Sequence, residues 1–142
     1  MEKIAVIYWS GTGNTEMMAM EIAEGIKAAG AEAAVMTVSE INAKGASAYS
    51  KLALGCPAMG AEVLEEMEFE PFFTELESCL MGRKVLLFGS YGWGDGQWMR
   101  DWQVRADNAG ANICGAPVLV HETPDADALA LCRVAGEAFV KA

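Results

Sequence analysis

A glycine-rich run, Ser10 to Thr15 (SGTGNT), has the residue types of a phosphate-binding loop. It follows an apolar run, Ile4 to Trp9, and opens a segment of helical periodicity. Its backbone N–H groups therefore lie at a helix start, where they lack internal partners and favour anions. The loop has no Lys, no Walker A ending and no GxGxxG spacing. These features favour a phosphate monoester held by amides and hydroxyls, and the alternative is an N-capped turn without a ligand.

Two further loops carry residues that suit a flat ring, Cys56 to Glu62 (CPAMGAE) and Gly89 to Gly96 (GSYGWGDG). Met59 precedes a glycine, and Trp93 lies between two glycines, which is atypical of a core residue. These side chains can form two walls of a slot, because thioether–aromatic and aromatic–aromatic contacts each add on the order of 1 kcal/mol. The alternative is that both cap the core. A planar ring with a phosphate tail is a mononucleotide, and flavin mononucleotide (FMN) fits best.

Strand and helix patterns alternate along the chain. The expected strands are Lys3–Trp9, Glu32–Val38, Lys51–Cys56, Lys84–Gly89 and Ala111–Val120, the last interrupted at Gly115-Ala116-Pro117. The expected helices are Thr15–Ala29, a short one over Glu40–Ala48 capped by Ser39, one or two pieces within Glu62–Leu80 with Pro71 able to start the second, Asp95–Ala109, and a last one opened by Pro124-Asp125.

Five β/α units in series predict an α/β fold, a doubly wound sandwich of three layers with a parallel sheet and helices on both faces. The length of 142 residues suits one domain, residues 1–142. Because parallel strands end at the same edge of a sheet, the three unusual loops are expected to meet there.

Net charge and amino-acid composition exclude further classes of partner and of metal site. The net charge of −10 argues against nucleic acid and anionic membrane as partners and favours a partner with a basic docking face. No apolar stretch approaches the roughly 20 residues that span a membrane. The four cysteines show no CxxC pair, and with one histidine there is no zinc or iron–sulfur spacing. We expect a cytoplasmic monomer with reduced cysteines and no metal.

The chain resembles flavodoxins, above all the short-chain type from anaerobic bacteria. The resemblance rests on the runs YWSGTGNTE (8–16), LGCPAMGAEVLEE (54–66), EPFF (70–73) and FGSYGWGDG–WMRDW (88–102). It implies a five-stranded sheet of order 2-1-3-4-5 and one non-covalent FMN. By motif, the cofactor-binding residues would be Ser10, Gly11, Thr12, Gly13, Asn14, Thr15, Ala58, Met59, Gly60, Ala61, Glu62, Ser90, Tyr91, Gly92 and Trp93.

The resemblance also implies a role for each loop. Ser10 to Thr15 would hold the 5′-phosphate, and Met59 and Trp93 would stack on the inner and outer ring faces. The Gly60–Ala61 peptide would adjoin flavin N(5), Glu62 would face ring N(3)–H, and the backbone of Ser90 to Gly92 would line the pyrimidine edge. A carbonyl that swings toward N(5) would stabilise only reduced flavin, and if that form is a type II turn, Ala61 would need a positive φ.

The sequence departs from the family pattern at three places. Position 61 is Ala where short-chain members often have Asp or Ser, which could tune the redox properties. Lys51 and Ala53 stand in the third strand, where they could weaken it. His121-Glu122, at the end of the fifth strand, stands where members often have Asn, and the pair has either a role or an exposed loop histidine without one.

The expected function is a low-potential one-electron carrier that serves redox enzymes in place of ferredoxin, without substrate turnover. Its partners would be iron–sulfur or flavin enzymes with basic docking faces. An FMN-dependent nicotinamide reductase is the first alternative, although no second nucleotide loop is evident. A phospho-receiver domain is the second, but Tyr8-Trp9-Ser10 and Cys56-Pro57 stand where its acidic residues would be.

Overall fold

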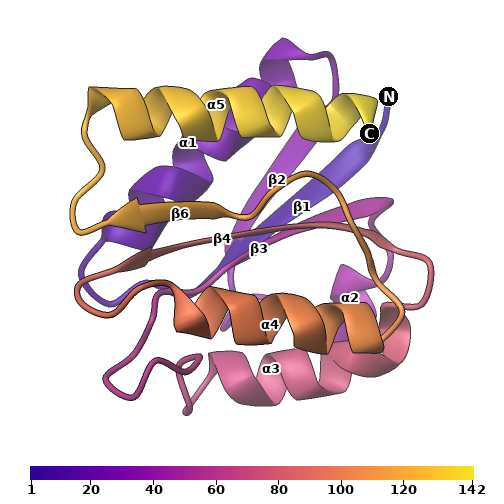
Figure 1. Cartoon of the computed structure of the whole chain (residues 1–142). Helices are drawn as coiled ribbons and strands as arrows, with labels where there is room; N and C mark the ends of the chain where they lie inside the picture. The colour runs from indigo at the N-terminus through magenta and orange to yellow at the C-terminus, as the bar shows by residue number, and fades with distance from the viewer.

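One parallel sheet lies between two layers of helices in the computed structural model, which describes residues 1–142 (Figure 1). The strands are β1 (Lys3–Tyr8), β2 (Glu32–Thr37), β3 (Lys51–Gly55), β4 (Lys84–Tyr91), β5 (Asn112–Ile113) and β6 (Val118–His121). Their order is β2-β1-β3-β4-β5, and β6 also pairs with β4. All strand pairs are parallel. β5 and β6 are therefore two pieces of a fifth strand interrupted at Gly115-Ala116-Pro117, and the order 2-1-3-4-5 is confirmed.

The helices form two layers that enclose the sheet. α1 (Asn14–Ala28) and α5 (Ala126–Lys141) cover one face, and α2 (Ala43–Ala46), α3 (Phe69–Leu76) and α4 (Gln97–Asn108) cover the other (Figure 1). A 3₁₀ turn, η1 (Glu77–Cys79), extends α3. The helices between strands return the chain across the sheet, so β1, β2, β3, β4 and β6 all end at the same edge.

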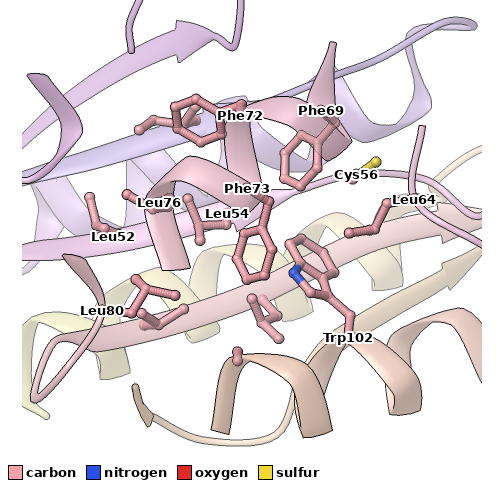
Figure 2. Close-up of a cluster of buried hydrophobic side chains, with 14 of the residues drawn as sticks. Leu52, Leu54, Cys56, Leu64, Phe69, Phe72, Phe73, Leu76, Leu80 and Trp102 are labelled. Carbon is pink, nitrogen blue, oxygen red and sulfur yellow. The ribbon is translucent and has the colours of Figure 1, made fainter. Parts of the chain in front are cut away.

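The core has one half on each side of the sheet, because successive strand side chains point to opposite faces. On β3, Leu52 and Leu54 belong to the half under α3 and α4, and Ala53 belongs to the half under α1 and α5. Figure 2 shows the first half, in which Phe69 and Phe73 of α3 meet Trp102 of α4 edge to face, with ring centroids 5.4 and 5.8 Å apart. Such aromatic pairs add about 0.5–1.5 kcal/mol beyond the area they bury.

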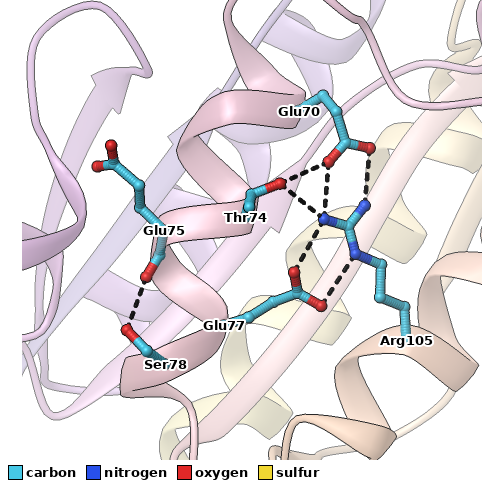
Figure 3. A network of polar contacts seen from close by, with 6 residues as sticks. All are labelled: Glu70, Thr74, Glu75, Glu77, Ser78 and Arg105. Atoms are coloured by element: carbon cyan, nitrogen blue, oxygen red, sulfur yellow. Dashed lines mark hydrogen bonds and ion pairs between the residues drawn. The ribbon is translucent and has the colours of Figure 1, made fainter.

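A polar network ties α3 and η1 to α4 at the surface of this half (Figure 3). The guanidinium of Arg105 donates to both carboxylate oxygens of Glu70 at 2.7 and 2.7 Å and to those of Glu77 at 3.0 and 2.9 Å. It also lies over the Phe73 ring, 4.9 Å from the centroid. Hydrogen bonding to Arg105, against the opposing effect of burial, holds the pKa of Glu70 below its ordinary value. The network fixes α4, which follows the Gly89 to Gly96 loop.

The starts of α2 and α3 differ from those expected. α2 is capped by Asn42, whose side chain accepts from the Gly45 N–H at 2.8 Å, whereas the Ser39 hydroxyl contacts Thr37 Oγ1. Residues 62–68 form no helix, and α3 begins at Phe69 rather than at Pro71. The Glu65 carboxylate accepts from three backbone N–H groups just before α3, at 2.7, 2.8 and 2.9 Å, and so caps its start.

Lys51 has a structural reason to stand at the start of β3. Its Nζ is buried and donates to the carbonyls of Phe139 and Val140, both at 2.8 Å, at the end of α5. The last carbonyls of a helix lack internal partners and favour a cation. β3 forms over Lys51–Gly55 in spite of Lys51 and Ala53, so the two residues do not prevent the strand.

Candidate functional site

Four loops at the carboxyl edge of the sheet enclose a cavity of ≈ 340 Å³. Ten of the residues expected at the site line it: Ser10, Gly11, Thr12, Asn14, Thr15, Ala58, Met59, Ser90, Tyr91 and Gly92. The other five, Gly13, Gly60, Ala61, Glu62 and Trp93, belong to the same loops but do not line it. The structure thus brings the three loops together, as expected from parallel strands.

Two other cavities suit a phosphate-bearing ligand less well than the cavity at the strand ends does. One of ≈ 410 Å³ lies between the Ser10–Thr12 loop and the end of β2. The carboxylates of Glu16 and Glu68 border it and would repel a phosphate. Another, of ≈ 400 Å³ between α5 and the fifth strand, is lined almost entirely by apolar side chains, Leu131 and Val134 among them.

The Ser10–Thr15 loop presents backbone donors without protein acceptors. The N–H groups of Gly11, Thr12, Asn14 and Thr15 make no hydrogen bond in the structure. The Ser10 hydroxyl, which was expected as a ligand donor, instead accepts from the N–H groups of Gly13 and Glu16 at 3.1 and 3.3 Å. Four free amides at the start of α1 are an anion site of the kind that helix N-termini provide.

Two hydroxyl contacts fix this loop against its neighbours. Thr15 Oγ1 and Ser90 Oγ lie 3.0 Å apart and buried, which joins the start of α1 to the end of β4. The Tyr8 hydroxyl donates to Glu16 Oε2 at 2.7 Å. Burial and then the nearby Glu16 carboxylate raise the pKa of Tyr8 to about 12, so the phenol stays protonated and keeps this bond.

Residues Met59 to Glu62 form a tight turn. The Glu62 N–H donates to the Met59 carbonyl at 2.8 Å, and the Met59 N–H donates to the Val63 carbonyl at 2.9 Å. Glu62 has φ 52, whereas neither Gly60 nor Ala61 has a positive φ. The structure therefore holds the turn in a form other than type II, and the residue in the left-handed region is Glu62 rather than Ala61.

The Glu62 carboxylate reaches from this turn to the loop after β4. A Cβ built on Gly94, which has φ +86, would lie 2.2 Å from Glu62 Oε1, so only glycine permits this approach. Glu62 Oε1 is buried and has no hydrogen-bond partner. A buried acceptor without a donor is costly and rare in folded proteins. It fits a ligand that brings an N–H group, such as the N(3)–H of a flavin ring.

The loop after β4 leaves Trp93 61% exposed and outside the cavity lining, so the expected pair of ring walls is formed only on the Met59 side. Tyr91 does line the cavity, and its ring lies 5.5 Å from that of Trp98 and 5.1 Å from that of His121. His121 Nε2 is 3.0 Å from the carbonyl oxygen of Gly92.

Three residues that line the cavity were not expected at the site: Trp9, Pro57 and Thr123. Glu122, for which a role beside His121 was left open, lines it too. Trp9 and Pro57 directly precede residues that were expected at the site, so their position in the motifs could have found them. Glu122 and Thr123 follow β6, and only the pairing of β6 with β4 brings them to the site.

The carboxyl edge of the sheet is acidic. Every charged residue in the loops that follow the strands is acidic: Glu40, Glu62, Glu65, Glu66, Glu68, Asp95, Glu122 and Asp125. Lys3, Lys51 and Lys84 instead stand at the starts of strands, at the opposite edge. A phosphate bound here would be held by amides and hydroxyls without a countercharge from these loops.

Comparisons of sequence and structure with known proteins agree on one family. The flavodoxin family profile matches residues 6–136. The chain is 47% identical to a flavodoxin of Megasphaera elsdenii over 98% of this chain and 99% of that one, and 50% identical to one of Clostridium beijerinckii over 84% and 87%. The solution structure of two-electron reduced Megasphaera elsdenii flavodoxin matches with a TM-score of 0.89, covering 98% of this chain and 99% of that chain.

Proposed function

The chain belongs to the flavodoxin family and is, like its members, an electron carrier that binds FMN, and on this basis we propose that the cavity between its strand-end loops holds the FMN. In this proposal, residues 1–142 act as a single FMN-binding domain that carries electrons one at a time, at low potential, between redox enzymes in place of ferredoxin.

The buried Glu62 oxygen is the observation that carries the assignment of the site. Glu62 Oε1 lies against Gly94, between the two loops that would flank the ring, and lacks a donor. The ring N(3)–H of FMN would supply that donor. The free amides of Gly11, Thr12, Asn14 and Thr15 would hold the phosphate, and Met59 and Trp93 would cover the ring faces.

FMN supplies a ring that accepts and releases electrons one at a time, and the residues around it set the potential. The acidic loops and a phosphate without a countercharge both oppose the addition of negative charge. Met59 and Trp93 would exclude water from the ring, which further disfavours a charged ring. A low potential follows from these three features.

The side chains support electron transfer without turnover of a substrate. Burial raises the pKa of the Cys56 thiol well above its ordinary range, so the cysteine nearest to the Met59 turn is a poor nucleophile. His121 Nε2 contacts the Gly92 carbonyl and the Glu122 carboxylate rather than a hydroxyl or a thiol. No nucleophile is paired with a base at the site.

The acidic edge supports docking to iron–sulfur or flavin enzymes that present basic faces around their own redox centres. Opposite charges speed the encounter and suit weak, exchangeable contacts. We further propose a monomer in the cytoplasm, since all four cysteines are free thiols, which persist in reducing compartments. None of the helices combines the length and the hydrophobicity needed to cross a bilayer.

Selectivity for the phosphate tests the assignment of the site. FMN should bind at least tenfold more tightly than riboflavin, measured by quenching of flavin fluorescence, because charge-assisted bonds to amides contribute roughly 1.5–3 kcal/mol. Thr12→Asp places an anion beside the phosphate and should weaken FMN strongly while leaving riboflavin affinity nearly unchanged. Equal affinities for FMN and riboflavin in the unmodified protein would show that the loop does not bind the phosphate.

A further inference from the structure

The segment Gly92 to Gly94, which carries Trp93, is held to the rest of the protein by one hydrogen bond. None of its backbone N–H or C=O groups makes a bond to another backbone group. Its single recorded bond joins the Gly92 carbonyl to His121 Nε2 at 3.0 Å. Trp93 is 61% exposed, so packing adds little restraint, and the flanking glycines are intrinsically flexible.

His121 is well placed to restrain this segment, because its backbone belongs to the sheet. It is the last residue of β6 and lies opposite Tyr91, the last residue of β4. The Glu122 N–H donates to the Tyr91 carbonyl at 2.7 Å. The His121 ring packs on the Tyr91 ring, which in turn packs on the buried Trp98.

The groups that face the His121 imidazole show which of its two nitrogens carries a hydrogen. The Gly92 carbonyl and the Glu122 carboxylate, 3.4 Å away, both face Nε2, and both can only accept. Nε2 must therefore carry a hydrogen, whether the ring is neutral or protonated. The Nε2–H group donates to a carbonyl that belongs to the Gly92–Trp93 peptide, and this peptide sets the direction in which the Trp93 side chain leaves the backbone.

We propose that His121 is a positioning residue of the cofactor site, which holds the Gly92–Trp93 peptide so that the Trp93 ring can close on the bound flavin. The inference rests on the proposed position of FMN beside Trp93. Its consequence is kinetic: without the His121 bond, the segment samples open arrangements in which Trp93 no longer covers the ring, and FMN leaves faster.

The tautomer of the ring is a direct spectroscopic test. His121 is the only histidine, so its two imidazole nitrogens give unambiguous signals in long-range ¹H–¹⁵N NMR spectra of the FMN-loaded protein. We expect the neutral ring to be protonated at Nε2. A neutral ring protonated at Nδ1 would leave no donor toward Gly92 and would overturn the proposal.

Substitutions test the effect on the cofactor, measured as the rate at which flavin fluorescence appears when FMN is released. His121→Ala should speed release about fivefold, the factor that one neutral hydrogen bond contributes. His121→Gln should restore the rate to within about twofold, because the Gln amide carries an N–H about as far from Cβ as imidazole Nε2. Glu66→Gln, which removes a negative charge from an exposed side chain at the same edge of the sheet but outside the cavity lining, is the matched control and should leave the rate near that of the unmodified protein.

A double-mutant cycle with Trp93→Ala separates the positioning role of His121 from the position of FMN beside Trp93. If His121 acts through Trp93, His121→Ala should add little to the faster release of Trp93→Ala. Fully additive effects, or a Gln variant as fast as the Ala variant, would overturn the positioning role while leaving the site in place. A Trp93→Ala protein that releases FMN at the unmodified rate would instead refute the proposed position of FMN, and the role of His121 with it.

Discussion

Glu62 combines two features that neighbouring residues lack. It holds a positive φ that is unusual for a residue with a side chain, and one oxygen of its carboxylate, Oε1, is buried against Gly94 without a donor. Strain and an unpaired acceptor in one residue are typical of a ligand site rather than of a stable turn. Its neighbour Ala61 has an ordinary φ in this form of the turn, so the two residues lead to separate predictions.

Glu62→Gln should make the second reduction step of the bound FMN easier. The substitution removes a negative charge beside a ring that becomes anionic when fully reduced. At an effective dielectric constant near 20, two charges roughly 5 Å apart interact by ~3 kcal/mol before solvent screening, so we expect a change of about 1 kcal/mol. Anaerobic redox titration measures it. A second potential that moves downward would contradict the charge argument.

Ala61→Gly should widen the gap between the two one-electron potentials, with the first becoming more positive. Rotating the Gly60–Ala61 peptide toward the ring, into a type II turn, gives residue 61 a positive φ, which costs alanine about 1 kcal/mol more than glycine. The gain would be at most that amount, because glycine also loosens the other form. Ala116→Gly, the same change in an exposed loop that does not line the cavity, is the matched control. A gap that stays unchanged in the Ala61→Gly protein would show that this residue does not limit the rotation.

Glu65 decides where α3 begins. It lies buried in the stretch after the Met59 turn, and its carboxylate accepts from the N–H groups of Met67, Glu68 and Phe69. Phe69 is the first residue of α3, and its N–H would lack a partner in an isolated helix. Burial opposes its ionisation, but the bonds from Phe69, Glu68 and Met67 outweigh burial and lower the pKa of Glu65. The cap ties the position of α3 to that of the loop beside the site.

The contribution of Glu65 should depend on pH with a defined sign. Because its folded pKa is lowered, its stabilisation is fully present above the unfolded value of about 4.3 and is lost as the pH falls through the folded value. Glu65→Gln should therefore lower the free energy of unfolding by about 1–2 kcal/mol near pH 7, the usual effect of a helix cap. The difference from the unmodified protein should shrink below about pH 4. Urea unfolding with FMN in excess at both pH values measures it, and a difference that grows in acid would contradict the assigned role.

Charge divides the whole molecule between the two edges of the sheet. The loops at the carboxyl edge carry only acidic residues, whereas lysines stand at the starts of three strands at the other edge. The site lies at the acidic edge, so the field of the protein should orient a partner or a small oxidant toward it.

Small redox reagents test this division without knowledge of the partner. The reduced protein should react faster with a cationic metal complex than with an anionic one of similar potential, in stopped-flow measurements at low salt. The advantage should fall several-fold as salt rises from about 0.01 to about 0.5 M, because the Debye length shrinks from roughly 30 to below 8 Å. Glu66→Lys at the acidic edge should reduce it, whereas Glu24→Lys in α1, the same reversal outside these loops, should have a smaller effect. Equal effects of the two reversals would show that net charge alone governs the rate.

The sequence by itself determined the succession of strands and helices along the chain, the interruption of the fifth strand and the meeting of three loops at one edge of the sheet. It also determined the family to which the chain belongs. Each of these depends on local residue types or on the direction of parallel strands, which spacing along the chain reveals. The positions of Met59, Tyr91 and most of the Ser10–Thr15 loop at the cavity follow from the same local rules.

Only the tertiary structure decided which partner each polar group takes. Lys51 binds carbonyls 88 and 89 residues away, Thr15 meets Ser90, and His121 reaches back 29 residues to Gly92. The start of α3 and the positive φ of Glu62 likewise depend on a carboxylate and a turn that no periodicity marks. Hydrogen-bond geometry between distant segments is set by how the helices pack on the sheet, and a few tenths of an ångström decide whether a bond forms. Residue spacing along one chain does not carry that information.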